Sequence, residues 1–97
     1  MMPRTLTIPV NGVYFDQIRE GTKLEEYRLR TVHWESRIEG KDFDAVVLTR
    51  GYPKGGGVEG ETRLTRQWRG FERKVITHPH FGESPVSVFA IDVSTPA

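Results

Sequence analysis

The chain has 97 residues, with 36% hydrophobic and 28% charged side chains, no cysteine and a formal net charge of +1. These values describe one globular domain over residues 1–97, and they exclude a disordered chain, disulfides, cysteine nucleophiles and cysteine-based zinc sites. No apolar run approaches the roughly 20 residues of a membrane span, and the stretch MMPRTLTIPV lacks the pattern of a secretory signal, so we expect a cytoplasmic protein without a membrane partner.

The first two predicted elements are a strand and a short helix. Residues 5–10 alternate with period two and predict a strand, in which Pro9 favours an edge or an end. Residues 13–20 carry apolar side chains at helical spacing, with either Asn11 or the following glycine as N-cap. Gly21 stands where a left-handed residue ends such a helix.

A charged strand is predicted next, over residues 23–30. Period-two alternation places Glu26 and Arg28 on one face and Lys23 on the other, at the mouth of the strand. If the face of Glu26 points into the protein, its charges must be paired or met by a polar ligand, because an unpaired buried charge costs several kcal/mol or more. The alternative is a set of cross-strand ion pairs on a solvated face.

The remaining pattern predicts a mainly β protein. Residues 33–38 indicate a helical turn, 43–49 a strand buried on both faces, 51–60 a glycine-rich loop, and 62–68, 74–77 and 86–93 three further strands. Five or six strands, one early helix and no βαβ rhythm favour a small mixed β-barrel of the α+β kind. An open α+β sandwich would bury the same strands.

The loop after residue 49 carries an aromatic side chain between two cations. Arg50, Tyr52 and Lys54 precede a triple glycine, and no Gly-Lys-Ser/Thr sequence follows that would make a P-loop. Such a mobile loop could stack a base and contact phosphate. The alternative is a long hairpin connection that glycine makes flexible.

Basic residues are concentrated in the middle of the chain. Residues 50–74 hold seven cations and three acids, 7 − 3 = +4, whereas the remainder holds 7 − 10 = −3. Within this segment Arg63, Arg66, Trp68 and Arg69 combine cations with an aromatic ring, as proteins that bind single-stranded nucleic acid do. The alternative is an exposed ribbon in which Trp68 caps the core.

Histidines raise the question of a metal. His78-Pro79-His80 is a compact pair, but His33 is the one other histidine in the sequence, and a structural metal needs three or four supported ligands. We therefore expect no metal and no cofactor.

Two adjacent motifs resemble a known family. They are Tyr14-Phe15-Asp16-x-Ile18 and Gly21-x-Lys23-x-x-Glu26-x-Arg28. A short helix followed by G-x-K-x-x-E-x-R running into a strand resembles the ASCH domain, a branch of the PUA-like β-barrel superfamily. Trp34, the strand over residues 43–49 and the Arg50-Gly51-Tyr52 that ends it also resemble small bacterial and phage-encoded ASCH proteins. The resemblance is strongest over residues 5–54 and weaker after residue 60.

The resemblance implies a cleft beside the helix and a function related to RNA or nucleosides. Lys23 and Glu26 would be catalytic in a hydrolase, and the ligand-binding residues would be Arg28, Tyr27, Trp34, Arg50, Tyr52 and Lys54. Some ASCH proteins are nucleases, and one subgroup hydrolyses the amide of acetylcytidine with a lysine, a threonine and a glutamate. Lys23 matches that lysine, whereas Glu26 stands where the subgroup has threonine.

Three functional hypotheses follow. The first is a module that binds RNA, another single-stranded nucleic acid or a modified nucleoside, as a monomer or a weak homodimer. The second is a ribonuclease or an acylated-nucleoside amidohydrolase that uses Lys23 and Glu26. The third is a non-catalytic module for protein interaction, in which the motif charges are structural ion pairs.

Overall fold

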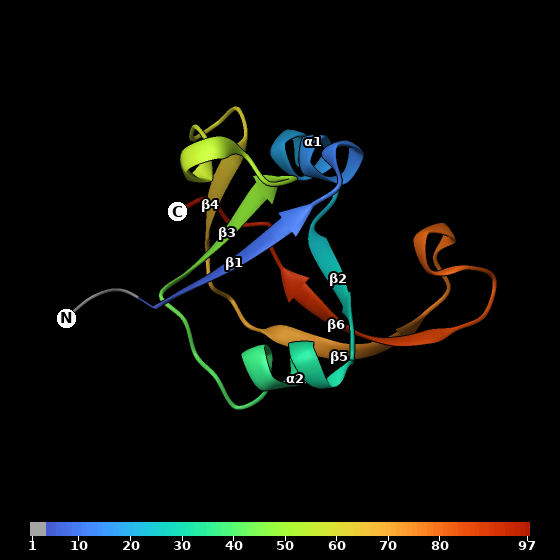
Figure 1. The fold of residues 1–97 in the computed structure, drawn as a ribbon. Helices are drawn as coiled ribbons and strands as arrows, with labels where there is room; N and C mark the ends of the chain where they lie inside the picture. Colours follow the sequence, from blue (N-terminus) through green and yellow to red (C-terminus); the bar gives the residue numbers. More distant parts are fainter. Residues whose placement is uncertain (1–3) are drawn as a thin grey trace.

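Two open three-stranded sheets form the framework of the molecule, a computed structural model that describes residues 4–97 (Figure 1). Met1, Met2 and Pro3, at the start of the N-terminal stretch considered above, lie outside the described residues. The first sheet has the order β1 (Thr5–Val10), β3 (Ala45–Arg50), β4 (Arg63–Gln67), and the second β2 (Glu25–Leu29), β6 (Val86–Asp92), β5 (Phe71–Ile76). Strands β1 and β3 run parallel, whereas β3–β4, β2–β6 and β5–β6 are antiparallel.

The mixed α+β class is confirmed, but the expectation of a closed barrel is wrong. Closure would require a backbone ladder between the edges of the two sheets. The outer side of β4 instead pairs with the C-terminal segment, where Gln67 N–H donates to the Thr95 carbonyl at 2.8 Å. Between β1 and β2 the Arg28 side chain donates to the Pro9 carbonyl, so a side chain provides a hydrogen bond across this edge. Pro9 lies on an edge strand, as predicted.

The helices begin and end where local chemistry predicts. Helix α1 (Gly12–Glu20) starts after Asn11, whose side chain accepts the Val13 N–H at 2.8 Å. It ends at Gly21, whose φ of 84° is the left-handed conformation that glycine adopts without steric cost. Helix α2 (Val32–Ile38) extends the predicted helical turn, and η1 (Lys54–Gly56) and η2 (Pro79–Phe81) are single 3₁₀ turns.

The core lies between the two sheets and the helices. On β1 the alternating side chains are buried, as the period-two pattern predicts, and on β3 four consecutive residues are buried, which confirms a strand covered on both faces. Phe15 and Ile18 bring one face of α1 onto this core. The buried hydrophobic residues are Leu6, Ile8, Val10, Phe15, Ile18, Ile38, Val46, Val47, Leu48, Leu64, Val88, Phe89, Ala90, Ile91 and Val93.

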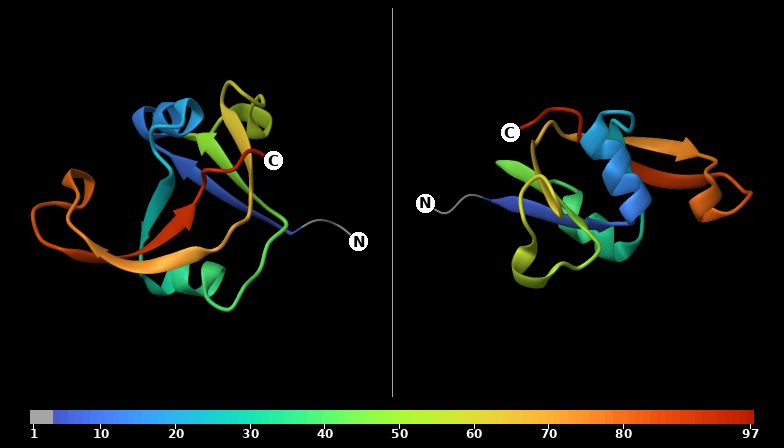
Figure 2. Two further views of the ribbon diagram at one scale, coloured as in Figure 1. Left: turned by 180° about the vertical axis from the view of Figure 1, so that it is seen from behind. Right: turned by 90° about the horizontal axis from the view of Figure 1, so that it is seen from above.

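Most strand boundaries differ from the prediction by one to three residues, and the start of β2 affects the site. Strand β2 begins at Glu25, two residues later than expected, because residues 22 and 23 still donate their N–H groups to the last turn of α1. Strand β5 begins at Phe71, three residues earlier, because its ladder with β6 starts at the pair Phe71–Ile91. The connection from β5 to β6 projects beyond the two sheets and carries η2 (Figure 2). Within residues 4–97, no helix has the length and apolar character needed to cross a membrane.

Candidate functional site

A cleft of about 330 Å³ lies where α1, β2, α2 and η2 meet. The charged side chains of its wall are Lys23, Glu26 and Arg28, the three charged residues of the sequence motif. Its other walls carry the aromatic rings of Tyr14, Tyr27, Trp34 and Phe81 and the imidazoles of His78 and His80. The cleft therefore brings residues separated by more than 60 positions in the sequence into one polar site with aromatic walls.

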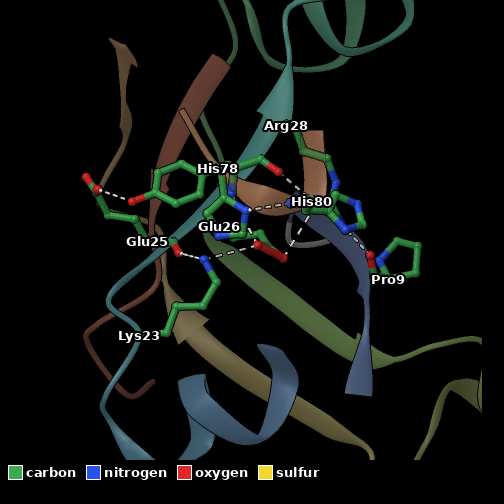
Figure 3. Close-up of polar contacts among 8 residues, drawn as sticks. Pro9, Lys23, Glu25, Glu26, Arg28, His78 and His80 are labelled. Carbon is green, nitrogen blue, oxygen red and sulfur yellow. Dashed lines mark hydrogen bonds and ion pairs between the residues drawn. The ribbon is translucent and has the colours of Figure 1, made fainter. Parts of the chain in front are cut away.

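Glu26 is the buried centre of the charged cluster, with only 3% of its surface exposed. Its Oε1 lies 3.4 Å from Lys23 Nζ and accepts the Tyr27 N–H at 3.2 Å. Its Oε2 lies 3.5 Å from Arg28 Nη1 and is buried without a hydrogen-bond partner. A buried carboxylate keeps its charge at low cost only beside cations, and here two cations flank it (Figure 3).

Arg28 binds the strands as well as the carboxylate. Its Nη1 donates to the Tyr27 carbonyl at 2.9 Å, its Nη2 donates to the Pro9 carbonyl, and its guanidinium lies 5.3 Å from the ring centre of Trp34. Burial lowers the pKa of Arg28, and the neighbouring Glu26 opposes that shift. The guanidinium is thus held from several sides, which fixes the wall of the cleft.

Lys23 reaches Glu26 from outside the strand. The backbone N–H of Lys23 donates to the Gln17 carbonyl at 3.2 Å, so the residue belongs to the turn that ends α1. Strand alternation therefore does not apply to it. The prediction that Lys23 and Glu26 face opposite ways is therefore wrong. Lys23 Nζ donates to the Glu25 carbonyl and lies 4.4 Å from the ring centre of Tyr27, a distance at which a cation and a ring attract.

Two histidines complete the cleft, and sequence reasoning considered them only as metal ligands. The ring of His78 lies 5.6 Å from that of Tyr14 and 6.1 Å from that of Tyr27, measured between centres. Its Nδ1 accepts the His80 N–H at 3.1 Å, which fixes the start of η2. The proximity of η2 to β2 depends on β6, which pairs with both β2 and β5, and no local signal in the sequence reveals that pairing.

The loop after β3 begins beside the cleft but does not line it. Gly51 N–H donates to the Val10 carbonyl at 2.9 Å, which holds the loop next to the end of β1. Arg50 pairs with Asp16 at 3.4 Å, and Tyr52 is 91% exposed. Lys54 lies in η1 and is also exposed. These three sequence-predicted ligand residues therefore lie outside the cleft wall, whereas Tyr27 and Trp34 form part of it.

The residues of the predicted nucleic-acid surface, on and just after β4, each make separate local contacts. Arg63 pairs with Glu59 at 3.6 Å, and Arg66 donates to the Ile18 carbonyl at the end of α1. Arg69 is exposed beyond the strand. Arg63 and Arg66 are three positions apart on a strand, so their side chains leave opposite faces. The structure does not gather these cations into one surface.

Trp68 is part of the core rather than of a stacking platform. Its ring packs edge-on against Phe43 with centres 4.9 Å apart, and it also approaches Phe71. Its indole N–H donates to Asp42 at 2.9 Å. A half-buried tryptophan with its polar atom satisfied closes one end of the core.

A second, wider hollow of about 590 Å³ shares Tyr14, Lys23, Tyr27 and His78 with the cleft. Here Lys74 Nζ lies 2.9 Å from Glu25, which also accepts the Tyr27 hydroxyl at 3.2 Å. The hydrogen bond that Lys74 donates to Glu25 raises the pKa of Lys74, and burial together with the Glu25 charge raises the pKa of Tyr27. Asp92 brings a second carboxylate to this hollow.

Within residues 4–97, no three histidine or carboxylate side chains come close enough together to hold a metal ion. We compared the chain with protein-family models, with curated proteins and with solved structures, and none of them matched it. A functional interpretation therefore rests on the geometry of the cleft and on the sequence motif.

Proposed function

We propose that the chain is an ASCH-like, PUA-related module that binds a nucleobase or nucleoside, free or within single-stranded RNA, in this cleft. The observation that carries the proposal is the buried Lys23–Glu26–Arg28 cluster at the base of a cleft with aromatic walls. A site of this kind combines apolar contact area with a few fixed polar groups, which is the usual composition of a small-molecule pocket.

The dimensions and chemistry of the cleft suit a base. A volume of about 330 Å³ lies at the lower end of the range for ligand pockets, roughly 300–1,000 Å³. Tyr14 and Tyr27 offer aromatic surface, and stacking on such rings contributes about 1–3 kcal/mol per base. Glu26 can accept an N–H from the edge of a base, while Lys23 can donate to a ring carbonyl or nitrogen.

The motif resemblance supports the same proposal. Gly21, Lys23, Glu26 and Arg28 of the G-x-K-x-x-E-x-R pattern occupy one turn and one strand, and its three charged residues line the same cleft. The resemblance to ASCH domains implied a cleft beside the early helix, and Tyr14 of α1 does lie in the wall. An RNA or nucleoside ligand is what that family likeness adds to the chemistry of the cleft.

Calorimetric titration tests the proposal. The four common ribonucleosides, acetylcytidine and a short single-stranded RNA are titrated into the protein at low salt, where phosphate contacts are strongest. We expect at least one of these ligands to bind, and we expect Lys23→Ala to reduce its affinity about tenfold or more. Lys41→Ala, which removes an exposed lysine outside the cleft, is the matched control. No binding by any ligand, or equal binding by wild type and Lys23→Ala, contradicts the proposal.

A hydrolase is the second candidate, and one contact favours it. The 3.4 Å distance between Lys23 Nζ and Glu26 Oε1 places an amine beside a carboxylate inside the cleft, with His78 in the same wall. Lys23 would act as base or nucleophile, and Glu26 would position it or carry the proton. Incubation with RNA and with acetylcytidine, followed by chromatography, decides: product that disappears in Lys23→Ala supports a hydrolase, and no product from wild type rejects it.

A further inference from the structure

We infer that the ligand of this cleft presents a phosphate group to it, so that a nucleoside monophosphate or a terminally phosphorylated nucleotide binds in preference to the neutral nucleoside. This inference rests on the proposed function and specifies the chemical class of its ligand. Two independent features of the cleft wall carry it: an uncompensated positive charge and an excess of hydrogen-bond donors.

The charge of the cleft wall does not balance. Lys23 and Arg28 are cations, and Glu26 is the one acid among the residues that line the cleft. The side chains of Lys23 and Arg28 are 12% and 19% exposed, so water screens these charges poorly. One buried carboxylate between two largely buried cations leaves one positive charge without a partner. A bound anion would offset the desolvation cost of that charge, whereas a neutral ligand would increase it.

Three of the remaining polar side chains of the wall have free donors, whereas an acceptor atom of each already binds a backbone N–H of the protein. Asn11 Oδ1 accepts the Val13 N–H at 2.8 Å, which leaves the side-chain amide NH₂. Thr31 Oγ1 accepts the Trp34 N–H at 3.3 Å, which leaves the hydroxyl hydrogen. His78 Nδ1 accepts the His80 N–H at 3.1 Å, so the neutral ring carries its hydrogen on Nε2.

A donor-rich wall selects a ligand rich in acceptors. The oxygens of a phosphate accept hydrogen bonds and carry the negative charge that the wall lacks. A ribose hydroxyl or a base edge, by contrast, brings its own donors, for which Glu26 is the one acidic acceptor in the wall. Both the charge and the hydrogen bonds therefore favour a phosphate in this cleft.

Lys23 is the residue placed to meet the phosphate. Its ammonium has three N–H groups, of which one donates to the Glu25 carbonyl and one faces Glu26 Oε1, and the third remains for a ligand. Arg28 has less to offer, because its two terminal nitrogens already contact the Tyr27 and Pro9 carbonyls and Glu26.

The neighbouring hollow does not share this preference. It contains the carboxylates of Glu25 and Asp92 beside Lys74 and the shared Lys23, and Lys74 is already paired with Glu25 at 2.9 Å. The two carboxylates balance the two cations there, so the excess positive charge, and with it the phosphate, belongs on the side of the cleft that contains Arg28.

Paired titrations test the inference. The four ribonucleosides and their 5′-monophosphates, with inorganic phosphate as a third arm, are titrated into wild type, Lys23→Gln and Lys41→Gln at low salt. We expect the best monophosphate to bind at least about tenfold more tightly than its nucleoside. Lys23→Gln should reduce that ratio to about threefold or less, because the wall then becomes neutral, while Lys41→Gln should leave it unchanged. Lys23→Gln keeps the Glu26–Arg28 pair, and its fold is checked by circular dichroism.

The outcomes separate this inference from the proposed function. If nucleoside and monophosphate bind equally, or if the ratio of their affinities is unchanged in Lys23→Gln, the preference for a phosphate is rejected while nucleoside binding stands. If inorganic phosphate binds as tightly as every monophosphate, the cleft binds an anion, and the proposal that it recognises a nucleoside is rejected. If nothing binds, both proposals fail.

Discussion

Glu26 Oε1 lies 3.4 Å from Lys23 Nζ, and the two residues reach each other from different elements, one from strand β2 and the other from the turn that ends α1. Arg28 approaches the other carboxylate oxygen at 3.5 Å. The cluster therefore joins helix to strand, and its ion pairs contribute to stability as well as to the chemistry of the cleft.

Removal of the central carboxylate should destabilise the fold strongly. Glu26→Gln leaves two cations close together in a largely buried place, and a broken buried ion pair typically costs 3–5 kcal/mol. Because Lys23 and Arg28 retain some access to water, we expect a loss of about 2–3 kcal/mol in the free energy of unfolding. Lys23→Gln should cost less, because Arg28 still pairs with Glu26. Urea denaturation of the three proteins measures this order, and a Glu26→Gln protein as stable as wild type contradicts it.

The guanidinium of Arg28 should matter for stability through its backbone contacts. It donates to the carbonyls of Tyr27 and Pro9, and hydrogen bonds from a charged group contribute about 1.5–3 kcal/mol. We expect Arg28→Met to lower the free energy of unfolding by about 2–3 kcal/mol. In contrast, Arg30→Met, which removes a more exposed pair with Glu35, should cost less than about 1 kcal/mol. Thermal and urea unfolding compare the two variants. Equal losses in the free energy of unfolding would show that the hydrogen bond from Arg28 to Pro9 of β1 adds no stability.

The phenol of Tyr27 should titrate later than an ordinary tyrosine. Burial and the Glu25 carboxylate raise its pKa above 10. The fold therefore favours the neutral phenol, and this contribution to stability is fully present below pH 10 and is lost as the pH rises through the higher folded pKa. Ultraviolet absorbance at alkaline pH follows the three tyrosines, and Tyr27→Phe identifies the late one. Glu25→Gln should move that step to lower pH; an unchanged step would mean that Glu25 does not act on Tyr27.

Asp92 should make stability depend on acid pH. The Ser94 hydroxyl and N–H donate to its Oδ1 at 2.6 and 2.9 Å, and these bonds hold the pKa of Asp92 below its ordinary value of 3.8. The ionised form is favoured in the fold, so the contribution is present above pH 3.8 and is lost as the pH falls through the lower folded pKa. Ser94→Ala should cost less than about 1 kcal/mol near neutrality, and the difference from wild type should shrink in acid. A difference independent of pH would contradict this account.

Local signals predicted much of this molecule because they depend on neighbours in sequence. The left-handed Gly21 was predicted, and Asn11 was one of the two predicted N-caps, because both are properties of single positions. Alternation on β2 correctly placed Glu26 and Arg28 on one face, since both belong to the strand. The prediction for Lys23 was wrong because the turn at Gly21 delays the start of β2. The same turn brings the Lys23 side chain to Glu26.

Features that depend on distant pairing could not be predicted in the same way. His78 enters the cleft because β6 lies between β2 and β5, and nothing near the His78-Pro79-His80 sequence indicates that order. The absence of a closed barrel has a similar origin. The C-terminal segment pairs with β4 at the edge where a barrel would close, and this pairing depends on contacts between residues about 30 positions apart, such as Gln67 and Thr95. The roles of Arg66 and Trp68 depended on which neighbours would cover them, so the sequence left open whether the basic segment is a nucleic-acid surface or a ribbon in which Trp68 caps the core.

The most direct test of the central claim is an NMR titration of the ¹⁵N-labelled protein with a nucleoside monophosphate. We predict chemical-shift changes that cluster at Tyr14, Lys23, Tyr27, Trp34 and His80, saturate with ligand, and weaken strongly in Lys23→Gln but not in Lys41→Gln. Absence of shifts at any concentration, or shifts centred on β4 around Arg63 with the cleft unchanged, would contradict a binding site at the Lys23–Glu26–Arg28 cluster.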